Sequence, residues 1–307
     1  MGTNTVDAPG PTSQPSSATP PLPSALDAPV AELATRDTGR LAYYADFAAA
    51  GRPLLLIHSI NAAPSSFEVK PLFDHYCGQR PVFSLDLPGF GLSERDDRRY
   101  SPALFADAVT AMLEQVIGEP ADLLALSLSC EFAARAALTV PGRVASLVLI
   151  SPTGFGHRAV PPAWVGRVAY GLLNQPPWRQ GLYDLVASRR SIRYYLGKSF
   201  SGSAPEAMID YAYATSHQPG ARYAPLYFLS SQLFTPKAAD RLYAKLVDLP
   251  VLAIADRDPY VTFDQLPEFA AVRPNWQFET LAPHMGLPHW ERPEATFAAL
   301  DRFWRGR

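Results

Sequence analysis

The 307-residue chain has 48% hydrophobic residues, 18% charged residues and a formal net charge of −2. This composition is typical of a soluble globular protein, and so small a net charge gives no reason to expect nucleic acid as a partner. No run of eighteen apolar residues occurs, which excludes an ordinary membrane-spanning helix. The two cysteines, Cys77 and Cys130, are far apart and form no disulfide framework, so we expect a reducing, cytoplasmic location.

The first thirty residues differ in composition from the rest. They contain seven prolines among Ser, Thr, Ala and Gly, and they have no apolar run. Such a segment cannot bury enough apolar surface to offset the entropy lost on ordering, and it lacks the apolar h-region of a secretory signal peptide. The sequence therefore predicts a disordered, Pro-rich tail over residues 1–30.

A hairpin over residues 30–47 is followed by apolar runs that alternate with helical stretches. Residues 53–57 form a continuous apolar run, as in a strand buried on both faces, and further buried strands are expected over 81–85, 122–126, 144–150 and 250–255, with a last strand over 276–281. Helices are expected over 65–76, 102–117, from 128 onward and over 291–304, the second of them after the capping residue Ser101. This alternation predicts an α/β fold, with a mainly parallel central sheet and helices on both faces.

The pattern is interrupted between residues 151 and 235. This segment holds 14 of the 35 aromatic residues, and its seven arginines and one lysine outnumber three acids. Short helical pieces are separated by proline pairs. We interpret it as a helical cap inserted into a core made of residues 31–150 and 236–307. A helical layer within the core is the alternative, because aromatic stripes usually serve packing.

Polar residues end three of the predicted strands. His58, Asp86 and Ser127 each follow an apolar run directly or end it. In open parallel sheets, functional groups gather at the carboxyl ends of the strands. Three such placements indicate one shared site.

Ser127 lies where a strand passes directly into a helix, in the frame Ala125-Leu126-Ser127-Leu128-Ser129. This arrangement is that of a nucleophile elbow, usually spelled G-x-S-x-G, whose flanking positions must be small because strand and helix nearly touch. Ala125 and Ser129 meet that requirement. The alternative interpretation of Ser127 is an ordinary helix N-cap.

Four segments together resemble the α/β-hydrolase fold superfamily, over roughly residues 31–305. Residues 85–93 look like the D-x-P-G-x-G-x-S turn of its esterase and carbon–carbon hydrolase branches. His58-Ser59 resembles the oxyanion loop, with Ser in place of Gly, residues 256–261 resemble the acid loop, and 287–294 resemble the final loop. The order Ser, then Asp, then His is also that of the superfamily. The resemblance implies a cap over the site and hydrolysis as the chemistry.

The resemblance also implies roles for individual residues. Ser127 would be the nucleophile, with the backbone N–H groups of Ile60 and Leu128 forming the oxyanion hole. Asp258 takes the position of the triad acid, and Asp256, two residues earlier, is the second candidate. No cofactor is expected, and the six scattered histidines show no metal-ligand spacing.

The general base departs from the family frame. Relatives have G-H-x-P-x-x-E-x-P, and counting back from Pro288, Glu291 and Pro293 places Gly286 at the histidine position. The nearest histidines are His284, our candidate base, and His289, the alternative. A protein with no base at all is the third possibility.

Two functions therefore remain open. The leading hypothesis is a serine hydrolase that cleaves an ester or related acyl bond of a largely apolar small molecule under the cap. Arginines such as Arg189, Arg190 and Arg193 would hold an anionic group of that substrate, unless they form a solvated helix face. The alternative is a hydrolase-fold protein without hydrolytic activity, either a binding protein or a lyase-like enzyme.

Overall fold

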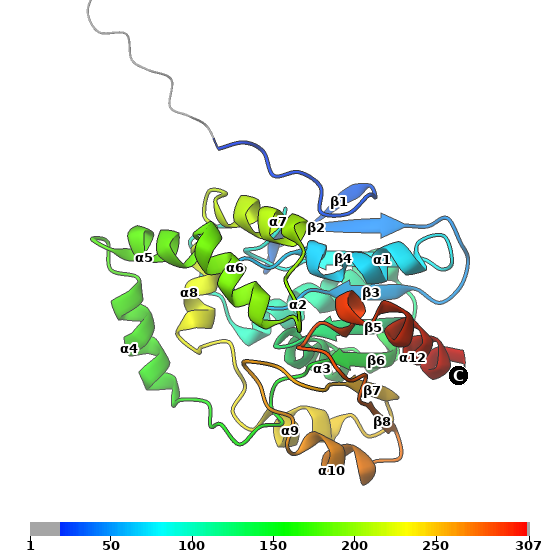
Figure 1. Ribbon diagram of the computed structural model, residues 1–307. Helices are drawn as coiled ribbons and strands as arrows, with labels where there is room; N and C mark the ends of the chain where they lie inside the picture. The colour runs from blue at the N-terminus through cyan, green and yellow to red at the C-terminus, as the bar shows by residue number, and fades with distance from the viewer. Residues whose placement is uncertain (1–18, 306–307) are drawn as a thin grey trace, which may run out of the picture.

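An eight-stranded sheet forms the centre of the computed structural model, which describes residues 19–305 (Figure 1). Its spatial order is β1-β2-β4-β3-β5-β6-β7-β8, and all neighbours from β4 to β8 are parallel, whereas β1–β2 and β2–β4 are antiparallel. The strands are β1 (Val30–Thr35), β2 (Gly39–Asp46), β3 (Leu54–Ile57), β4 (Val82–Asp86), β5 (Ala121–Leu126), β6 (Val144–Ile150), β7 (Val251–Ile254) and β8 (Trp276–Glu279). The predicted α/β fold class is confirmed.

Helices cover both faces of the sheet, which explains why the strand sequences are continuously apolar. Leu55 and Ile57 face one hydrophobic cluster, whereas Leu54 and Leu56, one residue out of phase, face the other. The first face is covered by α2 (Pro102–Ala111), α3 (Ser129–Thr139) and α10 (Leu266–Ala271), and the second by α1 (Lys70–Tyr76) and α12 (Pro293–Arg305). Helix α2 begins as expected, because the Ser101 hydroxyl accepts a hydrogen bond from the N–H of Leu104.

Five helices lie between residues 151 and 235, in the connection from β6 to β7, and α9 (Ala238–Arg241) follows them. The five are α4 (Ala163–Leu173), α5 (Arg179–Val186), α6 (Arg189–Lys198), α7 (Glu206–Ser216) and α8 (Tyr223–Leu229). The arrow of β2 points to the right in Figure 1, and β2 is antiparallel to β4. The parallel strands therefore end on the left of the picture, where α4, α5 and α8 lie. The insertion therefore lies toward the carboxyl ends of the strands. The division of the chain into core and cap stays a prediction.

Glu131 of α3 anchors both ends of this insertion. Its buried carboxylate accepts hydrogen bonds from the hydroxyl of Thr153 and the N–H of Thr235. Burial raises the pKa of Glu131, and these hydrogen bonds oppose that effect. The side chain of Glu131 thus joins Thr153 and Thr235, which are 82 residues apart in the sequence.

The segment before β1 makes specific contacts. The predicted tail covers residues 1–30, of which residues 1–18 lie outside the described residues. In the described part, Ala25 and Leu26 are buried, and the N–H of Ala25 donates to the hydroxyl of Tyr44 at 2.9 Å. The carbonyl of Pro23 accepts from the hydroxyl of Tyr211 in α7. Residues 20–26 therefore pack on the body of the protein rather than extend freely, because two apolar side chains and the tyrosine hydroxyls hold them.

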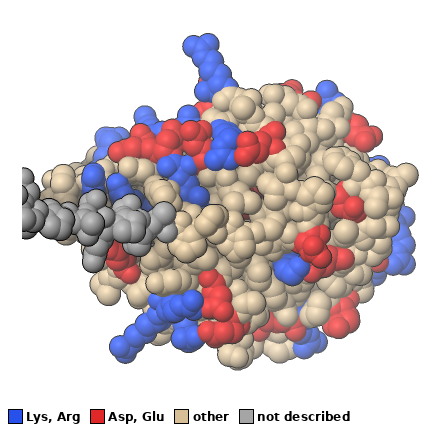
Figure 2. All heavy atoms as spheres, turned by 90° about the horizontal axis from the view of Figure 1, so that it is seen from above, with Lys and Arg blue, Asp and Glu red and all other residues tan. Residues whose placement is uncertain are grey.

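The surface carries charges of both signs. On the face seen in Figure 2, basic and acidic side chains are interspersed among uncharged ones and form no large field of one sign. Among residues 19–305, no helix has the length and apolar character that a membrane crossing needs.

Candidate active site

Ser127 lies on the turn between β5 and α3, with a φ of +51°. A residue other than glycine adopts this conformation only at a cost of about 1–3 kcal/mol, which the surrounding structure must offset. The N–H of Ser127 is fixed by the carbonyl of Ile150 at 2.8 Å, and the flanking Ala125 and Ser129 are fully buried. The N-cap of α3 is Leu128, without a side-chain capping bond, so Ser127 is not the N-cap of that helix.

Two backbone amides near this turn are available for a ligand. Neither the N–H of Leu128 nor that of Ile60 donates a hydrogen bond to another described residue. Leu128 begins the first turn of α3, where helix geometry leaves amides without an internal partner. Both side chains are buried, which fixes the backbone that carries these amides.

His58 is a structural residue. The N–H of Leu87 donates to its Nε2 at 3.0 Å, so the ring proton is on Nδ1 and donates to the carbonyl of Ser59 at 2.6 Å. The ring is fully buried and joins the loops that follow β3 and β4. Both nitrogens are therefore engaged in holding the scaffold.

Asp86 is likewise part of the scaffold. Its two carboxylate oxygens accept hydrogen bonds from the N–H groups of Ser66 and Leu92, each at 2.8 Å. Gly91 packs directly against this carboxyl group, with a φ of +52°, and a Cβ at that position would overlap it. The turn after β4 thus works by capping backbone amides with a carboxylate. The sequence correctly places His58, Asp86 and Ser127 at strand ends, but the first two have no free polar atom for catalysis.

Asp258, in the loop after β7, has one engaged and one free oxygen. Its Oδ1 accepts from the N–H groups of Tyr260 and Val261, whereas Oδ2 accepts no hydrogen bond within residues 19–305. Burial raises the pKa of Asp258 to about 6, partly opposed by the two backbone hydrogen bonds. Asp256 differs, since its Oδ2 accepts from the backbone N–H of His284 and lies 3.6 Å from Nε of Arg257.

The raised pKa of Asp258 predicts a stability change with pH. Because the folded pKa of about 6 lies above the ordinary aspartate pKa of 3.8, the folded state binds this proton more tightly and stability falls as pH rises between these values. We expect Asp258→Asn to increase the free energy of unfolding by about 1–2 kcal/mol at pH 7 and to change it little at pH 4. Urea denaturation at both pH values measures this difference. Equal effects at the two pH values would contradict it.

Gly286 lies beside the free oxygen of Asp258. A Cβ built on Gly286 would be 2.7 Å from Oδ2 of Asp258, so the position found by counting through the family frame does face the acid. However, Gly286 has a φ of +108°, a conformation that side-chain-bearing residues rarely adopt. No side chain fits there unless the loop and the Asp258 carboxylate move. Compared with the G-H-x-P-x-x-E-x-P frame, position 286 therefore differs in its backbone conformation as well as in its residue type.

His284 is buried and hydrogen-bonded to the loop backbone. Its Nδ1 accepts from the N–H of Gly286 at 3.1 Å, so the proton of the neutral ring resides on Nε2. That Nε2 is buried and has no hydrogen-bond partner among the described residues. Burial lowers the pKa of His284, which keeps the ring neutral. No hydrogen bond joins His284 to Asp258 or Ser127 within residues 19–305.

His289 is held in a different way. Its Nε2–H donates to the carbonyl of Glu68 at 2.8 Å, and the indole N–H of Trp290 donates to the same carbonyl at 2.7 Å. Complete burial lowers the pKa of His289 to about 4. The carboxylate of Glu68 in turn accepts from the N–H of Ser59 and the amide of Asn61. His289 therefore supports the loop that carries Ile60.

Ser151 connects the elbow with the loop of Gly286, and sequence reasoning missed it. It follows β6, has a φ of +49°, and its hydroxyl donates to the carbonyl of Gly286 at 2.9 Å. The preceding residue, Ile150, accepts the N–H of Ser127. A short polar residue at the end of a buried strand is the signal that could have identified it.

The three arginines suggested for substrate binding lie on α6 and are exposed. Arg189 pairs with Asp210 and Arg193 with Glu206, both on α7. These contacts join two helices at their solvent side, as in a solvated helix face.

Asp258 lines a cavity of about 450 Å³ together with residues 255–257, 261–264, 267, 278 and 280, and Ser127 is outside that set. No group of three or more potential metal ligands occurs within residues 19–305.

A family model described as "Alpha/beta hydrolase family" matches residues 54–300. Among curated proteins, the chain is 32% identical to the dihydrolipoyllysine-residue acetyltransferase components of the acetoin cleaving systems of Pseudomonas putida and Cupriavidus necator, over 109 and 115 residues. These matches cover 35% and 37% of this chain but 28% and 30% of those proteins. The chain thus spans less than a third of the curated relatives it matches.

Solved structures show the same architecture over most of the chain. A probable hydrolytic enzyme from Pseudomonas aeruginosa PAO1 has a TM-score of 0.70 at 19% identity, covering 91% of this chain and 95% of that one. A thermophilic esterase from Thermogutta terrifontis has a TM-score of 0.70 at 19% identity, with coverages of 91% and 99%. A serine hydrolase involved in carbazole degradation has a TM-score of 0.69 at 15% identity, with coverages of 91% and 100%. At these identities the likeness shows a shared fold.

Proposed function

The chain belongs to the alpha/beta hydrolase family, and from this premise we propose that it is a serine hydrolase acting on an ester or related acyl bond. Membership in the family supports a hydrolase as the broad class. The observation that carries the finer proposal is the φ of +51° at Ser127, together with two amides that have no acceptor among the described residues, that of the next residue, Leu128, and that of Ile60 in the loop after β3. A strained serine next to free amides is the arrangement that acyl transfer uses. We propose a largely apolar small molecule, bound under the inserted helices, as the substrate, and a cytoplasmic location.

The proposed reaction proceeds through an acyl-enzyme. The Oγ of Ser127 attacks the acyl carbon while its proton passes to the base, and the N–H groups of Leu128 and Ile60 stabilise the oxyanion. The leaving group departs with that proton, and water then hydrolyses the ester on Ser127. We propose His284 as the base and Asp258 as the acid. For this role the ring proton of His284 must move from Nε2 to Nδ1, which requires that Gly286 release Nδ1.

Labelling with a fluorophosphonate tests the nucleophile. We expect the folded wild-type protein to be modified at Ser127, and Ser127→Ala to abolish the modification, as read by mass spectrometry of the intact protein. Ser129→Ala is the matched control, because that hydroxyl is buried and has no hydrogen-bond partner, so labelling should persist. Absence of wild-type labelling, under conditions in which a known serine hydrolase reacts, would overturn the proposal.

A second candidate function rests on the surroundings of Gly286. The acid position faces a glycine, and the Nδ1 of His284 and the Nε2 of His289 are both bonded to backbone groups. A protein built in this way without rearrangement would bind a small molecule, or act on it as a lyase, without forming an acyl-enzyme. Binding of an apolar ligand together with an unlabelled Ser127 would favour this candidate.

A further inference from the structure

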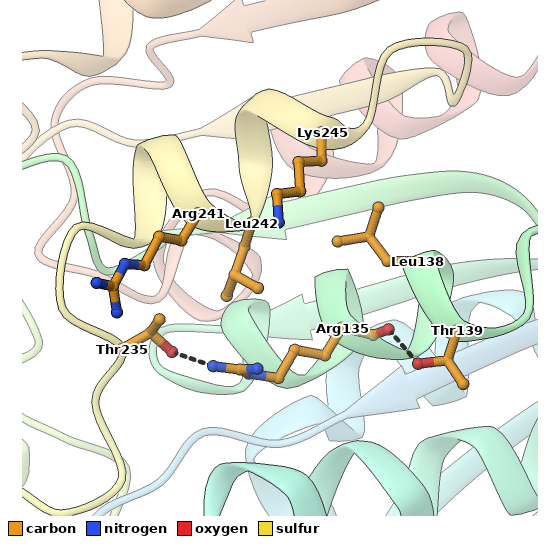
Figure 3. A pocket seen from close by; sticks show the side chains of 7 residues that line it. All are labelled: Arg135, Leu138, Thr139, Thr235, Arg241, Leu242 and Lys245. Carbon is orange, nitrogen blue, oxygen red and sulfur yellow. Dashed lines mark hydrogen bonds between the residues drawn. The ribbon is translucent and has the colours of Figure 1, made fainter.

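Three cationic side chains meet at a surface cavity of about 560 Å³ between α3 and the segment formed by α9 (Ala238–Arg241) and the turn Tyr243–Lys245. Arg135 comes from α3, and Arg241 and Lys245 come from the opposite wall (Figure 3). The other lining residues are Leu138, Thr139, Thr235 and Leu242. No carboxylate is among the lining residues, so the cavity is strongly electropositive.

Negative charge within residues 19–305 offsets these cations only in part, because Glu131 attracts Arg135 but forms no ion pair with it. None of the three forms an ion pair, in contrast to Arg189 and Arg193 on the inserted helices. The Nη2 of Arg135 donates to Oγ1 of Thr235 at 2.9 Å, whereas its buried Nε has no acceptor. Like charges that converge without a counter-ion repel one another. A bound anion would remove that repulsion.

Glu131 offsets only part of this positive charge. It lies one turn before Arg135 on α3, and its carboxylate accepts hydrogen bonds from the hydroxyl of Thr153 and the N–H of Thr235 rather than from Arg135. Burial raises the pKa of Glu131, and the charge of Arg135 opposes that rise.

We propose that this cavity binds the phosphate group of a small organic phosphate. A guanidinium presents two N–H donors in the geometry that phosphate oxygens accept, and an ammonium adds a second charge from the facing wall. Figure 3 shows Arg135 extending toward Thr235 and Lys245 directed into the space from above. Leu138 and Leu242 provide apolar contact for the organic part of the ligand.

The site is joined to the anchor of the inserted helices. Thr235 accepts from Arg135 through its hydroxyl and donates to Glu131 through its N–H, and Glu131 also holds Thr153. A ligand at Arg135 would therefore contact the residue at which the insertion returns to the core. This site is separate from the proposed nucleophile, since Ser127 does not line the cavity.

Calorimetric titration with inorganic phosphate and with phenyl phosphate, at constant ionic strength, tests the proposal. We expect both to bind the wild-type protein, with phenyl phosphate tighter because of the two leucines. Removing two of the three cations in R241Q/K245Q should raise the Kd at least about tenfold. The reason is that each hydrogen bond to a charged group strengthens binding about tenfold or more, and this variant loses two such bonds. Both side chains are exposed, so the double variant should fold.

Lys237→Gln is the matched control. Lys237 is an exposed cation on the same connection to α9 but outside the cavity lining, and its loss should leave the Kd nearly unchanged. The proposal is overturned if neither phosphate binds the wild-type protein. It is also overturned if R241Q/K245Q and Lys237→Gln weaken binding equally, because that result indicates nonspecific charge attraction.

Discussion

Gly91→Ala should lower the free energy of unfolding by about 3 kcal/mol, because it combines a strained backbone with a steric overlap. At φ +52° an L-residue costs about 1 kcal/mol, and the new methyl group would overlap the Asp86 carboxyl group. Moving that carboxylate breaks its hydrogen bonds to the N–H groups of Ser66 and Leu92, which would leave buried donors without partners.

Gly118→Ala is the control for this prediction. Gly118 has a φ of +74° and no atom within 4 Å of a built Cβ, so only the backbone cost of about 1 kcal/mol is expected. The comparison of the two variants by urea denaturation isolates the contact with Asp86. If both variants lose the same stability, Asp86 is not the rigid support that its hydrogen bonds indicate.

His284→Gln should reduce the rate of acyl transfer by at least about 1,000-fold if His284 is the base. In a serine protease, loss of the histidine lowers the turnover rate about 10⁶-fold, and the oxyanion hole and substrate binding account for the catalysis that remains. Glutamine can still accept the N–H of Gly286 through its amide oxygen, so the loop contact that the histidine makes can persist. The rate of fluorophosphonate labelling at Ser127 measures the effect, and the exposed His217→Gln is the control.

The pH profile provides a second readout of the same role. A general base must be neutral, and burial lowers the pKa of His284 below the ordinary histidine value of 6.5. The rate in the wild type should therefore rise with pH, with the midpoint of the rise below pH 6.5. A variant that labels as fast as the wild type over this range would show that His284 is not the base and would favour the non-hydrolytic candidate.

The fold class could be predicted from local sequence patterns. Strands such as 53–57 and 144–150 are continuously apolar because both of their faces are buried, and this local pattern needs no knowledge of the partner strands. The turn at residues 85–93 and the elbow at Ser127 could likewise be predicted from local sequence. Their glycines and small side chains are required by the backbone conformation of a few neighbouring residues. For the same reason Ser101 could be predicted as the N-cap of α2.

The roles of the polar side chains, in contrast, depend on long-range contacts in the folded protein. His58, His284 and His289 are equivalent as residue types, and their roles differ through hydrogen bonds to Leu87, Gly286 and Glu68. Two of these partners lie far away along the chain, beyond the reach of any local pattern. The approach of Gly286 to Asp258, the anchoring of both ends of the insertion by Glu131, and the packing of residues 20–26 also join distant segments. The positions of these polar residues at strand ends could therefore be predicted from the hydrophobic pattern of the sequence. Their protonation states and hydrogen-bond partners, in contrast, depend on contacts that form only when the chain folds.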